Sequence, residues 1–407
     1  MKIADYQTFV VANPAPHHGG IYWTFVKLTT DSGVAGYGEV YSVPFHPHTV
    51  ERMIADVCER CVLGADPFRI ERLWRVVFSS GYTQRPDISL MGVLSGIETA
   101  CWDIVGKELG KPVSELLGGR VRERLRSYTY IYPDQPEDSP TISNYPEGEE
   151  KSVYTDADMA AERASIYVRQ GFTALKLDPL GPYSAFDPRQ LSLDAQSRTE
   201  RFLRKIREAV GDKCDLLVGA HGQMTPAAAI RLARRLEKYD PLWLEEPVPP
   251  ANVDAMARVA AMTSIPIATG ERLTTKYEFA QVLERKAASI LQFALGSVGG
   301  ILEAKKIAGM AEAHYAQIAP HLYCGPIEGA ANIQIGLCSP NFLIQESIET
   351  WDGFHAQILK KPIRWEEGYI LPPTEPGLGV ELDEEVAACH PYNGERLNLT
   401  MFERPAE

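Results

Sequence analysis

The chain has 407 residues, of which 45% are hydrophobic and 23% are charged, and its 32 glycines and 29 prolines follow no repeat. This composition excludes a disordered, collagen-like or coiled-coil protein, and the length predicts two domains or one large α/β barrel with additions. With 41 basic and 54 acidic residues, the formal net charge is −13. Such a charge disfavours binding to nucleic acid or to an anionic membrane surface.

The cysteines and the apolar runs indicate the compartment. The seven cysteines are scattered, and their odd number is typical of reduced intracellular thiols. The early apolar run 8–12 is too short for the core of a signal peptide, and no uncharged apolar run reaches the roughly 18 residues of a membrane span. We therefore expect a cytoplasmic homo-oligomer that acts on a small molecule, without nucleic-acid or membrane partners.

Residues 1–124 are predicted to form an α+β domain. Strand-like patterns cover 3–11, 21–30 and 36–41, and helix-like patterns cover 48–61, 68–78 and 90–107. The segment 13–20 between the first two strands is rich in proline and glycine. We interpret it as a lid, in which His17 and His18 are candidate substrate-binding residues.

Residues 125–349 alternate short apolar strands with longer amphipathic helices. Eight strands are expected, at 126–132, 173–177, 215–218, 242–245, 265–269, 289–293, 317–319 and 342–345. This repeat predicts parallel βαβ units that close into a TIM-type (β/α)7β barrel, with an open doubly wound sheet as the alternative. An acidic segment, 133–155, is interpreted as a second lid or as a disordered surface insertion.

Residues 350–407 show no further βα repeat. We expect this tail to return to the N-terminal domain, so that the two together form an α+β cap on the barrel.

Reactive side chains follow the predicted strands at the end where a parallel barrel carries its active site. They are Lys176, Asp178, His221, Glu245, Glu271, Arg272, His321 and Glu346. So many charged groups would repel one another at one rim unless a cation or an anionic ligand lay between them.

Two pairs among these residues suggest chemistry. Glu245 and Glu271 are one βα repeat apart and suit a hard cation such as Mg²⁺, although pairing of either with Lys176 or a neighbouring arginine is an alternative interpretation. His221 and His321 lie on opposite sides of the predicted barrel opening, where they could donate and accept a proton across a substrate.

Motifs at these positions extend along most of the chain. They are Gly36-Tyr-Gly-Glu39, Leu117-Gly-Gly119, Gly219-Ala-His-Gly222, Leu244-Glu-Glu-Pro247, Gly270-Glu-Arg272, Ala319-Pro-His321, Gly325-Pro-Ile327 and Gln345-Glu346. This series resembles the mandelate racemase/muconate lactonizing enzyme group of the enolase superfamily. It is most similar to the sugar-acid dehydratase branch, typified by galactonate and mannonate dehydratases.

The resemblance implies a metal-dependent dehydratase that acts on an aldonate. Glu245 and Glu271 fall on ligand positions for Mg²⁺ or another divalent cation such as Mn²⁺, which would stabilise the enediolate formed when the proton α to the carboxylate is removed. His321 falls on the base that takes this proton, and His221 on the acid that protonates the departing β-hydroxyl.

Glu346 and Lys176 are the remaining catalytic candidates among the matched positions. Glu346 falls on a residue that hydrogen-bonds the substrate carboxylate, Lys176 on the first basic position of the second barrel strand, and Arg272 is a candidate substrate-binding residue.

Two positions depart from the family's pattern. Gly219 stands where the family has a third ligand, an aspartate, and Ala294 where it has an aspartate paired with the histidine of strand seven. We therefore expect weak activity on common aldonates, which the double substitution Gly219→Asp with Ala294→Asp should raise. The alternative functions are a racemase, epimerase or cycloisomerase of the same superfamily, and a catalytically silent barrel that binds a sugar acid.

The third ligand has two candidates. Asp178 stands where the racemase branch has a second lysine, and it could supply the missing oxygen because strands two and three are neighbours. A metal held by Glu245, Glu271 and His221 is the other arrangement, which would favour a borderline cation over Mg²⁺ and would consume the proposed acid.

Overall fold

The structure, a computed structural model, describes residues 1–133 and 152–406. An antiparallel sheet of strands β1 (Ile3–Ala12), β2 (Tyr22–Thr30) and β3 (Ala35–Val40) begins the chain. Helices α1 (Pro47–Val57), α2 (Ile70–Phe78), α3 (Ile88–Leu109) and α4 (Val113–Leu116) follow it. The helix predicted over 48–61 ends earlier as α1 and continues as a π-helical turn, Cys58–Val62, in which both cysteines are free.

Helix α3 lies directly on β3 because glycines leave no side chains between the two elements. A Cβ atom at Gly38 would lie 1.8 Å from the carbonyl oxygen of Gly96, so only glycine permits this approach. Among the described helices, α3 alone is long and apolar enough to cross a membrane, and 78% of its most apolar window is buried inside the protein. That burial is typical of a core helix.

The barrel predicted from the sequence is confirmed. Its parallel strands are β4 (Leu125–Tyr130), β5 (Ala174–Leu177), β6 (Asp215–Gly219), β7 (Trp243–Glu245), β8 (Ile267–Thr269), β9 (Ile290–Leu291), β10 (Gln317–Ile318) and β11 (Gln345–Glu346). The ring closes where β11 pairs with β4, and a parallel bridge between Ile318 and Phe342 connects β10 to the segment before β11.

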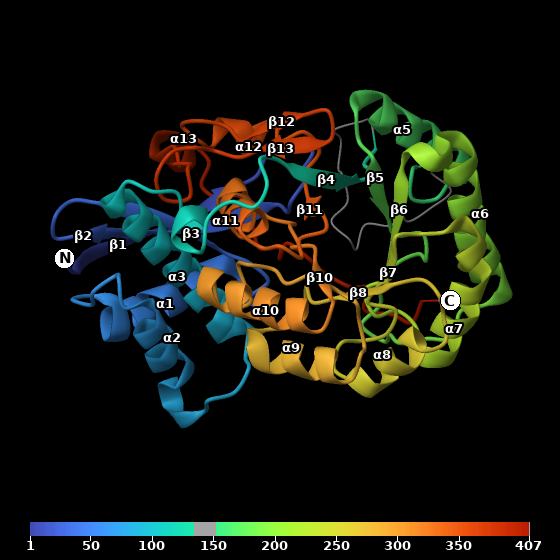
Figure 1. Ribbon diagram of the computed structural model, residues 1–407, viewed down its shortest axis with the longest axis horizontal. Coiled ribbons are helices and arrows are strands. Elements are labelled where there is room, and N and C mark those ends of the chain that lie inside the picture. Colours follow the sequence, from blue (N-terminus) through green and yellow to red (C-terminus); the bar gives the residue numbers. More distant parts are fainter. Residues whose placement is uncertain (134–151, 407) are drawn as a thin grey trace.

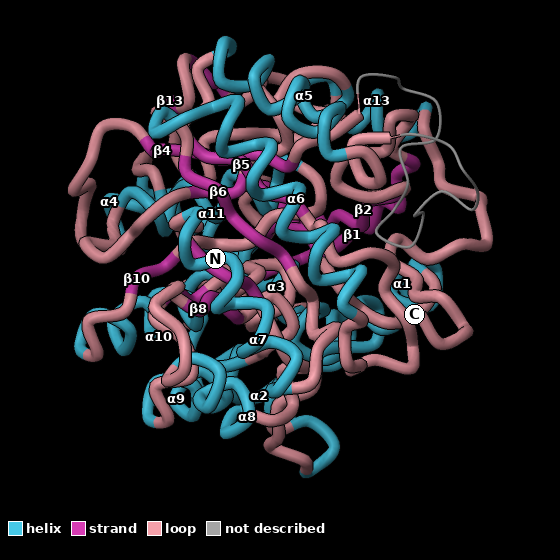
Figure 2. The backbone as a smooth tube through the Cα atoms, turned by 90° about the vertical axis from the view of Figure 1, so that its right-hand side faces the viewer, coloured by secondary structure: helices cyan, strands magenta, loops and turns pink. Residues whose placement is uncertain are grey.

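A helix follows each strand as far as β10 and covers the outside of the barrel (Figure 2). These helices are α5 (Ala157–Gln170), α6 (Leu193–Val210), α7 (Pro226–Leu236), α8 (Val253–Ala260), α9 (Thr275–Glu284), α10 (Ile301–Ala313) and α11 (Pro326–Leu337). Four of them begin at a side chain that accepts a backbone N–H of the first turn: Asp156 in α5, Ser192 in α6, Thr225 in α7 and Asn252 in α8. Such N-caps satisfy amide groups that would otherwise have no partner at the helix end.

The C-terminal tail contains regular elements that the sequence analysis did not predict. They are α12 (Phe354–Gln357), β12 (Arg364–Glu366), β13 (Tyr369–Leu371) and α13 (Glu384–Cys389). Strand β13 pairs antiparallel with β4, and α13 packs over the cap strands (Figure 1). The expectation that the tail returns to the N-terminal region to complete the cap is confirmed.

One buried apolar residue from each barrel strand, or from a position next to it, meets the others inside the barrel. This barrel-interior cluster comprises Tyr128, Ala174, Leu217, Trp243, Ala268, Ile290, Ala319 and Ile344. Because side chains two residues apart on a strand face the same way, the next inward layer toward the C-terminal end carries the polar residues described below.

Candidate active site

Four of the predicted site residues are buried polar side chains two positions after members of the barrel-interior cluster, and they therefore point into the same mouth of the barrel. They are Lys176, Glu245, His321 and Glu346. Two further predicted residues, His221 and Glu271, follow the ends of β6 and β8. The structure thus brings six residues predicted for the site to one end of the barrel.

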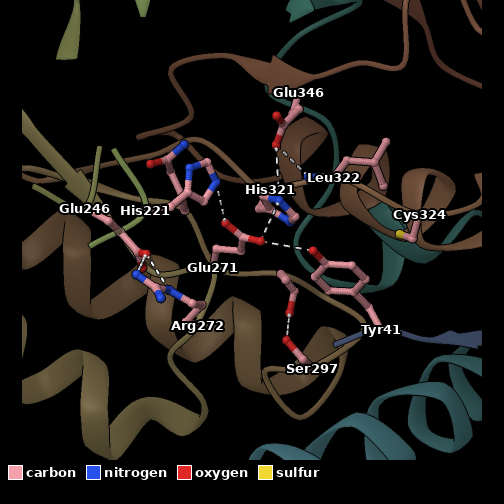
Figure 3. A network of polar contacts seen from close by, with 12 residues as sticks. Tyr41, His221, Glu246, Glu271, Arg272, Ser297, His321, Leu322, Cys324 and Glu346 are labelled. Atoms are coloured by element: carbon pink, nitrogen blue, oxygen red, sulfur yellow. Dashed lines mark hydrogen bonds and ion pairs between the residues drawn. The ribbon is translucent and has the colours of Figure 1, made fainter. Parts of the chain in front are cut away.

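Glu271 lies between the two histidines (Figure 3). Its Oε2 is 3.4 Å from Nε2 of His221, and its Oε1 is 3.3 Å from Nε2 of His321. The hydroxyl of Tyr41, from the cap, donates to Oε1 at 3.0 Å. Although burial opposes the charge, His321 and His221 hold the pKa of Glu271 well below its usual range.

Glu245 is held by three donors. Lys176 Nζ donates to its Oε1 at 2.6 Å, while Trp243 Nε1 at 3.2 Å and Gln292 Nε2 at 2.9 Å donate to Oε2. Burial would raise the pKa of Glu245, but Lys176 and His221 lower it overall. The structure therefore contains the pairing of Lys176 with Glu245 that the sequence analysis gave as an alternative interpretation.

His221 has an unusual backbone and a polar neighbour on each ring nitrogen. Its φ of +40° is uncommon outside glycine and is typical of residues held in place at functional sites. Nδ1 lies 2.8 Å from the hydroxyl of Tyr183, which donates to Asp178 Oδ2 at 2.7 Å. Burial lowers the pKa of His221, but Asp178 and Glu271 outweigh it and raise the pKa to about 9, so the ring is positively charged at neutral pH.

His321 has a partner on one side of its ring. Its Nε2 faces Glu271, while its buried Nδ1 has no hydrogen-bond partner among the described residues. Ala294 forms a parallel bridge with His321, so the alanine stands beside the histidine but offers no acceptor. Glu346 accepts the backbone N–H of Leu322 at 2.8 Å, and burial raises the pKa of its carboxyl group.

Asp178 occupies space over the end of β6. A Cβ atom at Gly219 would lie 1.8 Å from Asp178 Oδ1 and 3.4 Å from Cε1 of His221. The side chain of Asp178 therefore fills the place where a larger residue at 219 would begin. Its Oδ1 is buried and has no hydrogen-bond partner among the described residues.

The other predicted substrate-binding residues lie outside this cluster. Arg272 forms an ion pair with buried Glu246 at 2.6 Å. His17 contacts the backbone oxygen of Asn13 within its own loop at 2.6 Å. His18 stacks on Tyr132 after β4, with ring centroids 3.9 Å apart.

His18 connects the cap loop to the barrel mouth. Its Nδ1 is 3.2 Å from Glu349, which lies three residues after Glu346. The proposed lid loop thus reaches the rim. Most of the second predicted lid, residues 134–151 of 133–155, lies outside the described residues.

The donor set fits a divalent cation. His221, Glu245 and Glu271 offer ligand atoms that all lie within 4.8 Å of one another. Glu271 Oε2 is buried and faces His221 Nε2 at 3.4 Å without a well-formed hydrogen bond, so it is still able to accept an ion. Carboxylate oxygens with at most one imidazole suit Mg²⁺ or Mn²⁺.

Several site residues were not found by sequence reasoning. Gln292 and Trp243 lie on predicted strands at inward positions, and the period of two could have identified both. Tyr41 and Tyr183 carried no local signal, because they come from the cap and from the loop after β5 and meet the cluster only in the folded protein.

Comparison with known proteins agrees with this architecture. Residues 158–386 match the family model "Enolase C-terminal domain-like", and residues 18–118 match "Mandelate racemase / muconate lactonizing enzyme, N-terminal domain". Over 371 residues, 89% of each chain, the sequence is 38% identical to D-galactonate dehydratase of Ralstonia nicotianae.

Solved structures extend the similarity to the whole chain. A protein of Labrenzia alexandrii DFL-11 is 59% identical, with full coverage of both chains and a TM-score of 0.95. A mandelate racemase/muconate lactonizing enzyme-like protein from Roseovarius sp. TM1035 is 51% identical, with full coverage of both chains and a TM-score of 0.94.

Proposed function

The chain belongs to the mandelate racemase/muconate lactonizing enzyme group of the enolase superfamily, and from this premise we propose that it is a metal-dependent dehydratase of a sugar acid. The substrate class is an aldonate. Removal of the proton α to the carboxylate and loss of the β-hydroxyl as water would leave an enol, which becomes a 2-keto-3-deoxy acid. The 38% identity to D-galactonate dehydratase of Ralstonia nicotianae supports this reaction class.

The placement of the two histidines carries the proposal. His221 and His321 approach Glu271 from opposite sides at 3.4 and 3.3 Å, so a substrate bound at Glu271 would have an imidazole on either side (Figure 3). Elimination needs one group to take the α proton and another to protonate the leaving hydroxyl. We assign the first role to His321 and the second to His221.

A cation is needed because the substrate is an anion. Glu245 and Glu271 would repel a carboxylate, and together they are the residues that would hold the metal. A bound divalent cation supplies positive charge that stabilises the enediolate character of the reacting acid. Glu346, whose carboxyl pKa is raised by burial, could donate a hydrogen bond to the same substrate group.

The proposal is tested by incubating the protein with a panel of aldonates and Mg²⁺ in D₂O. We expect a 2-keto-3-deoxy acid, detected as its semicarbazone. His321→Asn should lose both deuterium incorporation at C2 and dehydration, whereas His221→Asn should lose dehydration and keep some exchange at C2. His314→Asn, at an exposed histidine after α10, is the matched control and should behave as wild type.

Two outcomes would contradict the proposal. Deuterium at C2 without loss of water, for every acid that binds, would indicate a racemase or epimerase. Binding of a sugar acid without exchange or dehydration would indicate a catalytically silent barrel.

A further inference from the structure

Asp178 and Gly219 fit together as a pair. Leu177 of β5 is in register with Val218 of β6, so Asp178 and Gly219 are the next neighbours on the two strands. The 1.8 Å separation between Asp178 Oδ1 and a Cβ atom built on Gly219 means that the aspartate leans across β6. Glycine at 219 therefore leaves the room in which the carboxylate of Asp178 sits.

The two oxygens of Asp178 have different surroundings. Oδ2 accepts the hydroxyl of Tyr183 at 2.7 Å, which holds the carboxylate in place. Oδ1 is buried and lacks a hydrogen-bond partner among the described residues, whereas Oε2 of Glu271, whose side chain is 5% exposed, has the ring Nε2 of His221 3.4 Å away. A buried carboxylate oxygen without a partner is destabilising, and a cation beside Oδ1 of Asp178 would relieve this cost.

We propose that Asp178 is the third carboxylate ligand of the metal, together with Glu245 and Glu271, and that Gly219 is required because it admits Asp178. This inference rests on the proposed function and deepens it by assigning a ligand. Three carboxylates suit Mg²⁺ better than two carboxylates and an imidazole. The assignment also leaves Nε2 of His221 available as the proton donor that elimination needs.

Mn²⁺ binding to the full chain, measured as the loss of the free-ion signal in electron paramagnetic resonance, tests the assignment without any substrate. Asp178→Asn, which is nearly isosteric, should weaken Mn²⁺ binding by about tenfold or more. Gly219→Asp alone should also weaken Mn²⁺ binding, because the new side chain would clash with the carboxylate of Asp178. Asp178→Ala combined with Gly219→Asp should recover most of the lost Mn²⁺ affinity. In this double variant the carboxylate ligand comes from position 219 on β6, and the alanine at 178 leaves room for it.

Two controls separate ligation from folding and from net charge. Asp215→Asn removes one carboxylate at the opposite end of β6, where it pairs with Arg126, and should bind Mn²⁺ as wild type does. Far-ultraviolet circular dichroism and melting temperature establish that each variant is folded. His221→Asn should keep Mn²⁺ affinity within a few-fold.

Wild-type affinity in Asp178→Asn would overturn the assignment, as would failure of the folded double variant to recover. A large loss in His221→Asn together with wild-type affinity in Asp178→Asn would identify the histidine as the ligand instead. If Mn²⁺ binding follows the expected pattern but no sugar acid is dehydrated, the proposed function fails and the ligand assignment stands.

Discussion

The strand beside His321 provides no hydrogen-bond acceptor for its imidazole ring. Its Nδ1 has no hydrogen-bond partner among the described residues, and Ala294 is its neighbour on β9's side of the barrel. We expect Ala294→Asp to stabilise the imidazolium by about 1.4 kcal/mol and so raise kcat for dehydration about tenfold. Ala294→Asn is the control, because asparagine has nearly the same size as aspartate but carries no charge. Equal kcat values in the asparagine and aspartate variants would contradict this explanation.

The structure changes what we expect of the double substitution suggested by the sequence. Gly219→Asp would bring a second side chain into the space of Asp178, so it should not add to the benefit of Ala294→Asp. Under the proposed ligand assignment, Asp178 would compensate for the altered position at 219 from the next strand, whereas none of the described residues supplies an acceptor to Nδ1 of His321.

His355 is a single buried residue that should make stability depend on pH. Its ring packs against Trp23 and Trp351, and Nε2 lies 3.0 Å from the carbonyl oxygen of Cys324. Burial lowers its pKa from 6.5 to about 4. Because the unfolded chain binds this proton first, stability should fall as the pH drops from 6.5 to 4, by about 3 kcal/mol in total.

Urea unfolding of wild type and His355→Gln at several pH values checks this effect. The variant should be less stable at pH 7, where it loses the packing of the imidazole, and the difference should shrink toward pH 4. The same slope of unfolding free energy against pH in both proteins would show that other groups cause the acid dependence.

At the scale of elements, two glutamates of the cap bind the N-termini of barrel helices. Glu39 of β3 accepts the backbone N–H groups of Gly325 and Glu328 at the start of α11, and Glu98 of α3 accepts those of Ile301 and Leu302 at the start of α10. Helix N-termini favour such acceptors, so these contacts join cap and barrel.

Substitution of Glu39 tests how much this contact contributes. Glu39→Ala leaves two buried N–H groups without their acceptor and should cost about 1–3 kcal/mol of unfolding free energy. Glu39→Gln keeps one acceptor oxygen and should cost less. Burial raises the pKa of Glu39 to about 8, so wild-type stability should fall as the pH rises from about 5 to 8, while the glutamine variant should not show this part of the fall.

The elements that the sequence predicted best are those with a local signal. The barrel strands were found because short apolar runs such as 215–218 are followed by a long amphipathic helix, and the site residues because they follow the strand ends. Strands β12 and β13 were missed because three-residue strands have almost no pattern of their own and exist through pairing with β4.

Site contacts that depend on distant segments could not be predicted. Tyr183 contacts His221, which is 38 positions away in the sequence, and Tyr41 contacts Glu271, which is 230 positions away. Neither tyrosine lies in a distinctive motif. The neighbourhood of Asp178 and Gly219 was predictable from strand order, but their steric fit was not, since it depends on the rotamer of the aspartate.

At the scale of the whole molecule, the segment after α13 crosses from the cap to the barrel. Tyr392 N–H donates to Val10 on β1, Asn398 accepts the N–H groups of Ile21 and Tyr22, and Phe402 N–H donates to the carbonyl oxygen of Tyr183 at 2.9 Å. The same segment therefore holds the start of β2 and the loop that carries Tyr183.

Phe402→Pro removes this donor and should loosen the loop of Tyr183. We expect a loss of about 1 kcal/mol in unfolding free energy and several-fold weaker Mn²⁺ binding, because Tyr183 holds Asp178. Phe402→Ala keeps the backbone N–H and is the control for the lost ring. Equal Mn²⁺ affinities in the two variants would show that this crossing does not influence the site.

Strand β4 obtains its final neighbours late. Residues 129–130 pair with β5, but residues 127–128 need β11 and residues 125–126 need β13, both far later in the chain, and the Ser127 hydroxyl donates to Gly368 across 241 positions. During synthesis, backbone N–H and C=O groups of β4 therefore remain unpaired while most of the barrel emerges from the ribosome. Slow ring closure of this kind leaves an unpaired strand edge open to aggregation, so yield during expression should depend on growth temperature and on chaperone supply more than the stability of the finished barrel would suggest.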